Sequence, residues 1–433
     1  MPKENILKKF NLEENDEIEL KLKSGRILKG VVLPSQKYLT LKLDSGYNVG
    51  ISSNKISSVK KLGKRKTGFK YQKMISVANK PTVAILHTGG TIASRIDYAT
   101  GAVKPSFSVE DLLALFPELG EKCNIDSKMI FNKFSEELNF GDYERIIEEV
   151  KKEIEKGVKG IILAHGTDTM HFTAAALSFA FENIPLPLIL VGAQRSSDRG
   201  SSDAAMNLLC AADVIVNTDF RGVAVCMHAS TEDKECVLLP GVKCRKMHTS
   251  RRDAFKAINA KPIAKINYEN SKVVFLRSDY ERVGDDKSKN WRVFPKFENK
   301  VALVKYYPNM DASIFEMLAD KKYKGVVIEG TGLGHTASAL HKPIKELIDN
   351  GCIVAMASQC IFGRVNMNVY STGRRLLQIG VLPCEDMAAE TAFVKLAWLL
   401  GNFSKEEAKL LFSKNLRGEI SARSNIAIDL WEG

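Results

Sequence analysis

From residue 81 onwards, short apolar runs alternate with longer stretches that have helical periodicity. This alternation is typical of an α/β protein with parallel sheets, because the apolar runs form buried strands and the stretches between them form helices. The expected strands are 83–86, 160–163, 188–191, 223–227, 273–276, 301–305, 326–328 and 353–356. The expected helices are 143–155, 173–180, 203–212, 343–349 and 388–400. A polar linker, 286–300, is expected to separate a larger domain, 81–285, from a smaller one, 301–433.

The N-terminal part of the chain has a different pattern. Over residues 17–51, polar and apolar side chains alternate with a period of two, and glycine-containing turns separate the runs. Short strands joined by tight turns, with no helix between them, predict a small antiparallel β-barrel. We expect this barrel to occupy residues 1–62 and a linker to occupy residues 63–80.

The positive charge of the chain is concentrated at its N-terminus. The whole chain has 63 basic and 51 acidic residues, a net charge of +12. Residues 1–80 contain 18 basic and 7 acidic residues, whereas the rest is nearly neutral. Residues 55–80 contain nine Lys or Arg and no acid. Such a run suits nucleic-acid phosphates, since binding releases counterions, and it is equally typical of a solvated linker.

Cysteine usage and hydropathy indicate the cellular compartment. The eight cysteines are scattered, form no CxxC pair and include several inside apolar runs, which predicts reduced, buried thiols rather than disulfides or a zinc site. The first residues lack the uninterrupted apolar stretch of a signal peptide, and no run of about 18 apolar residues occurs. The sequence therefore predicts a soluble, cytoplasmic protein without membrane contact.

Hydroxyl and carboxylate side chains follow two of the expected strands. The first strand leads into His87-Thr88-Gly89-Gly90-Thr91 and the second into His165-Gly166-Thr167-Asp168-Thr169. Ligands bind at the carboxyl edge of open parallel sheets, and glycines there let backbone N–H groups approach a developing oxyanion. A threonine hydroxyl becomes nucleophilic when a base takes its proton, and Lys246 is a candidate base.

Each of these features also has a simpler interpretation. The TGGT run at 88–91 is often only a tight turn or an anion nest. The residues 165–169 can serve to cap a helix, since Thr and Asp are favoured caps. Lys246 lies in a basic segment that is typical of a solvated loop, with Lys243, Arg245, Arg251 and Arg252.

Several other enzyme classes lack their motifs. The sequence has no GxxxxGK[ST], no HExxH and no GxSxG, which disfavours P-loop NTPases, zinc hydrolases and α/β-hydrolases. The glycine-rich segment 330–335 follows an expected strand but misses the third glycine of GxGxxG, which disfavours a dinucleotide site.

Together, the two threonine-containing motifs resemble the signatures of the bacterial-type L-asparaginase and glutaminase family. They occur in order, as ILHTGGTIAS at 85–94 and GIILAHGTDTMHFTAAALSF at 160–179. The resemblance covers about residues 81–433. It implies a two-domain asparaginase-like body in which Thr91 attacks the amide carbonyl of the substrate.

The same resemblance implies roles for further residues. Lys246, held by Asp168, would activate Thr167 or a water molecule. The family places a Ser-Gln pair on the substrate α-carboxylate, and the best match here is Ser135-Glu136, in which Glu replaces Gln. The substrate-binding set implied by the resemblance comprises Gly90, Ser135, Glu136 and Gly166.

A second resemblance spans nearly the whole chain. The segments 42–51, 243–255, 358–383 and 385–401 are similar to those of the D subunits of archaeal-type glutamyl-tRNA(Gln) amidotransferases, which have the N-terminal barrel that ordinary asparaginases lack. This resemblance implies a cofactor-free amidohydrolase that releases ammonia from glutamine or asparagine. It also implies a partner, the E subunit, that uses ATP and magnesium to activate Glu-tRNA(Gln), binds most of the tRNA and accepts the ammonia.

The resemblance to D subunits places the chain in protein biosynthesis, as part of a carbon–nitrogen ligase with glutamine as amido donor. It implies a homodimer through the asparaginase-like body, with two partner subunits. Two other functions remain open on sequence alone. One is a free-standing cytosolic L-asparaginase with an appended barrel. The other is a binding or scaffold protein with an inactive amidase fold, against which Thr91, Thr167, Asp168 and Lys246 argue together.

Overall fold

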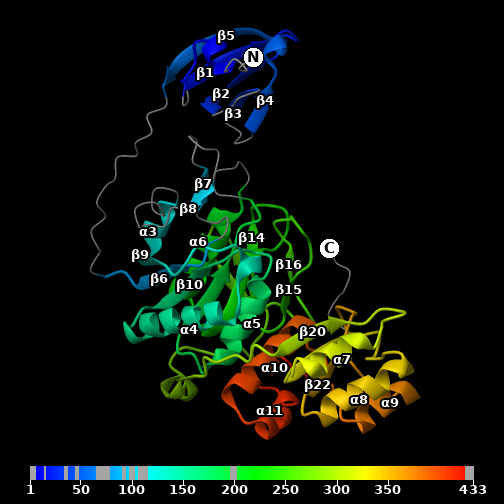
Figure 1. Ribbon diagram of the computed structural model, residues 1–433. Helices are drawn as coiled ribbons and strands as arrows, with labels where there is room; N and C mark the ends of the chain where they lie inside the picture. Colours follow the sequence, from blue (N-terminus) through cyan, green and yellow to red (C-terminus); the bar gives the residue numbers. More distant parts are fainter. Residues whose placement is uncertain are drawn as a thin grey trace.

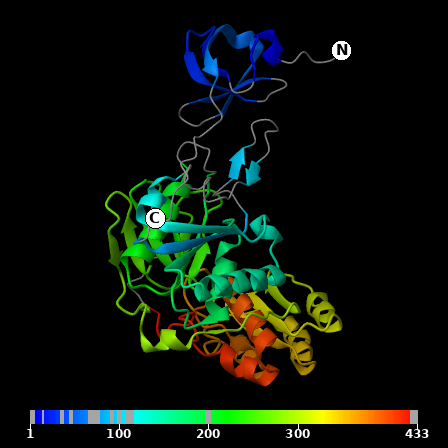
Figure 2. The same ribbon diagram turned by 90° about the vertical axis from the view of Figure 1, so that its left-hand side faces the viewer.

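Three bodies of structure follow one another along the chain (Figure 1). The computed structural model describes residues 6–13, 16–33, 38–43, 48–64, 79–89, 94–96, 103–105, 116–195 and 202–424. In both views the N-terminal sheet lies beyond the larger α/β domain, on the side away from the smaller one (Figures 1 and 2).

The N-terminal body is a five-stranded antiparallel sheet with the order β4-β3-β2-β1-β5. Its strands are β1 (Asp16–Leu22), β2 (Ile27–Leu33), β3 (Leu39–Leu43), β4 (Asn48–Ile51) and β5 (Ile56–Lys64), preceded by α1 (Ile6–Lys9). The alternating apolar side chains of these strands form its core, including Ile18, Leu20, Val32, Leu39 and Leu41. The antiparallel architecture is confirmed, and strands lie where the sequence predicts the first four.

The start of the basic run, which composition suggested to be a solvated linker, forms a fifth strand. Strand β5 lies where the sequence shows only the start of the basic run, and all but two of its side chains are exposed. It pairs with β1 at one end of the sheet. Lysines are a common protection of exposed sheet edges, so the same composition serves both a solvated linker and an edge strand.

The larger α/β domain is built on an eight-stranded sheet with the order β18-β17-β14-β13-β12-β10-β6-β9. Its parallel strands are β9 (Asn124–Met129), β6 (Thr82–His87), β10 (Gly160–Ala164), β12 (Pro187–Val191) and β13 (Gly222–His228). The remaining strands, β14 (Glu235–Pro240), β17 (Ala264–Asn267) and β18 (Val273–Phe275), continue the sheet in antiparallel fashion. The sheet is therefore mixed: its parallel strands agree with the expected α/β fold, and its antiparallel end adds three strands that run the other way or pair antiparallel.

Helices cover both faces of this sheet, which explains why its central strands are apolar throughout. One face packs on α4 (Phe140–Glu155) and α5 (Met170–Ala180), and the other on α3 (Glu118–Lys122) and α6 (Ala204–Asn217).

The smaller α/β domain has four parallel strands, in the order in which they occur along the chain. They are β20 (Val301–Lys305), β21 (Gly325–Gly330), β22 (Ile353–Ser358) and β23 (Leu382–Pro383). Its helices are α7 (Ser313–Asp320), α8 (His341–Asp349), α9 (Ser371–Gln378), α10 (Ala389–Asn402) and α11 (Lys405–Phe412). Side chains of α10 and α5 belong to one continuous core, so the two α/β domains share buried apolar contacts.

The segment after α11, residues 413–424, is fixed between the two α/β domains. Lys395 and Glu419 form a fully buried ion pair, with 2.6 Å between Nζ and Oε1. Lys395 also donates to the carbonyl of Phe412, at 2.8 Å. Arg417 donates from Nε to the carbonyl of Ser178 on α5, at 3.1 Å. Buried charges need such partners, so this terminal segment is part of the folded core.

Seven of the eight cysteines are buried and all eight are free thiols. Cys360 is exposed, which differs from the expectation that the thiols lie in the core. None of the helices in the described part of the chain has the length and apolar character that a membrane span requires.

Candidate active site

The two expected motifs emerge side by side at the carboxyl edge of the larger sheet. Strands β6 and β10 are parallel neighbours, with His87 opposite Ala164. Directly after β6, Thr88 donates from both its backbone N and its Oγ1 to the carbonyl of Ala164, at 3.1 and 3.2 Å. The buried Thr88 hydroxyl therefore joins the two strand ends.

A hairpin brings Lys246 to this edge. It consists of β15 (Cys244–Lys246) and β16 (Phe255–Ala257), which pair antiparallel. Lys246 Nζ lies 2.8 Å from Thr167 Oγ1 and 2.7 Å from Asp168 Oδ1. The lysine side chain is only 9% exposed, whereas the Asp168 side chain is 66% exposed. An amine between a hydroxyl and a carboxylate can exchange a proton with the hydroxyl while the carboxylate holds it in place.

The basic segment around Lys246 is an ion-pair network rather than a solvated loop. Lys243 pairs with Asp386 and Arg245 pairs with Glu390, both from the smaller domain. Arg251 and Arg252 also have carboxylate partners, Asp253 and Asp233. The interpretation of this segment as a freely solvated basic loop is therefore wrong.

His165 shapes the loop that carries Thr167. Its Nδ1 lies 2.6 Å from the carbonyl oxygen of Gly166, and its Nε2 lies 2.9 Å from Thr173 Oγ1 on α5. Burial lowers the pKa of His165 to about 4, so the ring is neutral at pH 7. A neutral ring donates from Nδ1 and accepts at Nε2, and these two contacts hold the loop against α5.

The loop does not serve to cap α5. Thr169 occupies the N-cap position, but its side chain makes no capping hydrogen bond. Its Oγ1 instead donates to the carbonyl of Ser135, at 2.6 Å. The simpler interpretation of this motif as a helix cap is wrong, because its last hydroxyl ties a second segment to the site.

That second segment contains the predicted Ser135-Glu136 pair. Ser135 is buried in a short 3₁₀ helix, Ser135–Glu137, whereas Glu136 is exposed. A Cβ on Gly166 would lie 2.8 Å from Ser135 Cβ, so only glycine fits there without displacement. The structure therefore brings Ser135 against the loop of Thr167, and places Glu136 at the surface beside it.

Gly89 packs on the same segment. Its φ is +110°, a backbone conformation that favours glycine, and an added Cβ would lie 2.4 Å from the carbonyl oxygen of Lys133. Lys133 N in turn donates to the carbonyl of Thr88, at 3.0 Å. Gly90 and Thr91, the next two residues of the motif, lie outside the described residues.

Sequence reasoning missed His171 and the two carboxylates from the smaller domain, Asp386 and Glu390. His171 is buried on α5, and its Nδ1 has no hydrogen-bond partner among the described residues. Burial and the positive charges of Arg245 and Lys246 lower its pKa to about 3. A lone histidine within an apolar helix gives no sequence signal, and ion-pair partners more than 100 residues away give none either.

Within the described stretches, no group of three or more His, Cys, Asp or Glu side chains is arranged to hold a metal ion. The arrangement that the residues do form, a lysine between a threonine and an aspartate, supports proton transfer and attack on a carbonyl by a hydroxyl group.

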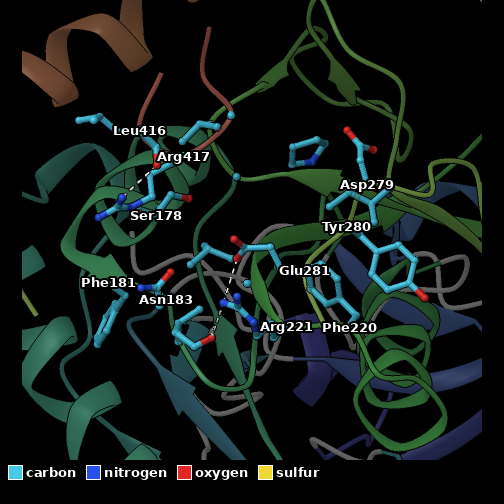
Figure 3. A pocket seen from close by; sticks show the side chains of 18 of the residues that line it. Ser178, Phe181, Asn183, Phe220, Arg221, Asp279, Tyr280, Glu281, Leu416 and Arg417 are labelled. Atoms are coloured by element: carbon cyan, nitrogen blue, oxygen red, sulfur yellow. Dashed lines mark hydrogen bonds and ion pairs between the residues drawn. The ribbon is translucent and has the colours of Figure 1, made fainter. Parts of the chain in front are cut away.

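A cavity of about 350 Å³ lies near the amino end of β13, on the side of the larger sheet away from the carboxyl ends of β6 and β10. Figure 3 shows residues that line it. It is lined by residues before β13, such as Arg221, and by the terminal segment, including Arg417. The Arg221 guanidinium pairs with Glu281 and Asp285, and Arg417 donates to backbone carbonyls. This cavity lies near the amino end of β13, whereas Thr167 follows the carboxyl end of β10, so it is separate from the candidate active site.

Family models match the three bodies of the chain in turn. The GatD N-terminal domain matches residues 12–62, the family described as "Asparaginase, N-terminal" matches 82–280, and the glutaminase/asparaginase C-terminal domain matches 300–412.

Relatives extend over nearly the whole chain. The D subunit of glutamyl-tRNA(Gln) amidotransferase from Pyrococcus furiosus is 48% identical, and the alignment covers 96% of this chain and 97% of the relative. The protein of the same name from Methanococcus maripaludis is 46% identical and is covered completely, again over 96% of this chain. The chain belongs to the family of glutamyl-tRNA(Gln) amidotransferase D subunits. Both of the family resemblances that the motifs indicate are thus confirmed.

Comparison with solved structures shows which part of the chain is shared with L-asparaginases. The thermostable L-asparaginase from Thermococcus kodakarensis superimposes with a TM-score of 0.70 at 28% identity, covering 79% of this chain and 100% of its own. L-asparaginase I from Vibrio cholerae gives a TM-score of 0.68 at 26% identity, with 79% and 99% covered. These asparaginases are therefore matched over almost their full length, and about a fifth of the D-subunit family member has no counterpart in them.

Proposed function

We propose that this chain is the glutaminase component of a tRNA-dependent amidotransferase, which hydrolyses glutamine and supplies the ammonia to a partner subunit. The observation that carries the proposal is the contact of Lys246 Nζ with both Thr167 Oγ1 and Asp168 Oδ1. This contact lies in an asparaginase-type domain within a chain of the D-subunit family.

The reaction proceeds in two half-reactions. The Thr91 hydroxyl attacks the side-chain carbonyl of glutamine, its oxygen forms an ester with the glutamyl group, and the amide nitrogen leaves as ammonia after taking up the hydroxyl proton. A water molecule then attacks the ester, which releases glutamate and restores the threonine hydroxyl. Backbone N–H groups near Gly89 and Thr167 stabilise the oxyanion, and such a donor contributes about 3 kcal/mol.

Residues of the two motifs, Lys246 and the Ser135-Glu136 pair provide proton transfer and substrate binding in this scheme. Lys246, held by Asp168, takes a proton from Thr167, which the proton of the attacking hydroxyl replaces, or takes one directly from the attacking water. It returns that proton to the leaving nitrogen or oxygen. Ser135, Glu136, Gly90 and Gly166 bind the substrate. The position of Ser135 against the Thr167 loop supports its assignment to the substrate α-carboxylate.

The assembly follows from the same proposal. The partner is the amidotransferase E subunit, which uses ATP and magnesium, accepts the ammonia and binds most of Glu-tRNA(Gln) in the cytoplasm. Two copies of this chain form the core through their α/β bodies, and each binds one partner. The barrel at 1–62 and the domains at 81–285 and 301–433 are the units of this chain in that assembly.

One assay tests the proposal. Glutamine and asparagine hydrolysis are measured for the chain alone and with the partner, ATP, magnesium and Glu-tRNA(Gln). Strong stimulation in the full mixture is the expected result. Unaided asparagine turnover would instead identify a free-standing L-asparaginase, and no turnover in any mixture would identify an inactive fold. In the active mixture, Thr91→Ala is expected to abolish hydrolysis in a protein that remains folded.

A further inference from the structure

The hairpin that carries Lys246 contacts both α/β domains. Successive side chains of a strand point to opposite faces. On one side, Arg245 and Lys243, the residue before β15, form ion pairs with the smaller domain. On the other side, Cys244 is buried in the core and Lys246 contacts Thr167.

Asp386 is the first of two carboxylates that hold this hairpin. Its Oδ2 lies 2.6 Å from Lys243 Nζ, and the two side chains are only 3% and 4% exposed. Its Oδ1 accepts from the backbone N of Ser421, at 2.8 Å, and its carbonyl accepts from Asn259 Nδ2, at 3.0 Å. Asp386 thereby fixes both ends of the hairpin to the loop before α10 and to the terminal segment.

Glu390 is the second carboxylate, and it lies in the first turn of α10. Its Oε1 lies 2.7 Å from an Arg245 guanidinium nitrogen, and its side chain is only 10% exposed. The next residue, Thr391, donates from its buried hydroxyl to the carbonyl of Val242, at 3.0 Å. The helix therefore holds the backbone on one side of Lys246 through both a charge and a hydrogen bond.

These contacts make the position of Lys246 depend on the smaller domain. Breaking a buried or largely buried ion pair leaves a charge without compensation, so the hairpin shifts to recover a partner. A shift of about 1 Å at β15 lengthens the 2.8 Å contact of Lys246 beyond a normal hydrogen bond. Misplacement of a reacting group on this scale reduces turnover by about a hundredfold.

We propose that Asp386 and Glu390 are positioning residues for amide hydrolysis, which set the distance between Lys246 and Thr167 from the neighbouring domain. The inference rests on the proposed function, because it concerns the rate of the same reaction. Neither residue contacts Thr167, and each acts through the β15 strand. Movement of the smaller domain relative to the larger one would therefore change the rate of ammonia release.

The test uses the full chain in the mixture that supports hydrolysis. Asp386→Asn and Glu390→Gln keep the shape of each side chain and remove its charge. The matched control is Glu385→Gln, which breaks the neighbouring ion pair with Arg364 without touching the hairpin. We measure kcat per active site, KM for glutamine and the thermal unfolding midpoint. Glu390→Gln is expected to lower kcat at least about tenfold with KM within about twofold, and Glu385→Gln to leave kcat within about twofold.

Reversing the ion pair between Arg245 and Glu390 tests whether turnover can be recovered. Arg245→Glu alone is expected to lose turnover, and its combination with Glu390→Arg is expected to recover most of it, because the strand regains its attachment. If Glu390→Gln keeps wild-type kcat, or if Glu385→Gln loses as much, the positioning role is wrong. Should Asp386→Asn not fold, Glu390→Gln and the reversed pair decide the question.

Crystal structures separate this inference from the proposed function. The distance from Lys246 Nζ to Thr167 Oγ1 is expected to exceed 3.5 Å in Glu390→Gln and to stay near 2.8 Å in Glu385→Gln. This distance is measurable even if the wild-type chain hydrolyses neither amide, a result that would overturn the proposed function alone. An unchanged distance in Glu390→Gln would overturn the positioning role alone.

Discussion

Lys246 Nζ lies 2.8 Å from Thr167 Oγ1, although 79 residues separate them in the chain. The contact joins a hairpin to the loop that follows β10, and Asp168 Oδ1 holds the same nitrogen at 2.7 Å. Because the lysine side chain is almost enclosed, its attraction to Asp168 is screened less than that of a surface pair.

Removal of this amine is the most direct test of the site. Lys246→Met keeps the aliphatic part of the side chain and is expected to lower kcat for glutamine by about 10²–10⁴-fold, as for the loss of a general base. The matched control is Lys256→Met on the paired strand, whose lysine is half-exposed and contacts Ala229 and Asp253. Steady-state kinetics and circular dichroism of both variants check the prediction. Comparable losses in the two variants would point to damage of the hairpin instead.

Gly166→Ala tests the assignment of Ser135 to substrate binding. The added Cβ would lie 2.8 Å from Ser135 Cβ, so the serine must move. We expect KM for glutamine to rise about tenfold, because displacement weakens binding of the α-carboxylate, with a smaller effect on kcat. Gly63→Ala in β5, where a Cβ would meet no atom within 4 Å, is the control. A KM equal to that of wild type would remove Ser135 from this role.

Buried neutral histidines are expected to make the fold sensitive to acid. The pKa of His165 is lowered from 6.5 to about 4, and those of His87 and His171 to about 3, chiefly by burial. The unfolded chain therefore binds protons that the folded chain does not, and stability is lost as the pH falls from about 6.5 towards 4. Each histidine contributes a loss of about 2 kcal/mol between pH 7 and pH 5.

Urea unfolding at the two pH values measures this loss. His165→Asn removes one titrating group and is expected to reduce the difference between pH 7 and pH 5. A wild-type unfolding free energy that is the same at both pH values would contradict the prediction.

Thiol labelling of the folded protein is expected to modify the exposed Cys360 much faster than the seven buried cysteines. Burial raises the pKa of the Cys244 and Cys352 thiols to about 12, and such thiols react slowly. Cys360 is exposed. The folded protein should therefore react rapidly with one equivalent of a disulfide reagent and the unfolded protein with eight. Cys360→Ser should abolish the rapid phase, and a second rapid equivalent would show that another thiol is accessible.

A test of RNA contact by the N-terminal basic run should use lysines that form no ion pair within the described part of the small sheet. Lys61 lies 2.7 Å from the buried Asp16, and Lys64 pairs with Glu13, so neutralising these lysines is expected to destabilise the small sheet. Lys55 and Lys60 are exposed. Their replacement by Gln should weaken tRNA-stimulated hydrolysis more at low salt than at high salt if the run approaches RNA. An equal fall in basal hydrolysis would show instead that the charge serves the fold.

Periodicity predicted most of the central elements because buried parallel strands are apolar throughout and lie between amphipathic helices. It missed β14 and β17, which follow β13 with no helix between them. It also missed β9, whose side chains are largely polar, and β5, whose exposed lysines conceal its alternation. The motifs placed Thr167, Asp168 and Lys246 in one site, and the geometry agrees. The sequence could not predict that the smaller domain holds the Lys246 hairpin, because Asp386 and Glu390 contact the hairpin only in the folded chain.

The buried pair of Lys395 and Glu419 has a consequence for synthesis of the chain. Until residues 413–424 have left the ribosome, Lys395 has neither Glu419 nor the carbonyl of Lys414 as a partner. A lysine without its carboxylate partner cannot be buried in the core at an acceptable cost, so α10 cannot complete its packing against α5. Because α10 also carries Glu390, we expect Lys246 to reach its final position only after residues 413–424 have emerged from the ribosome.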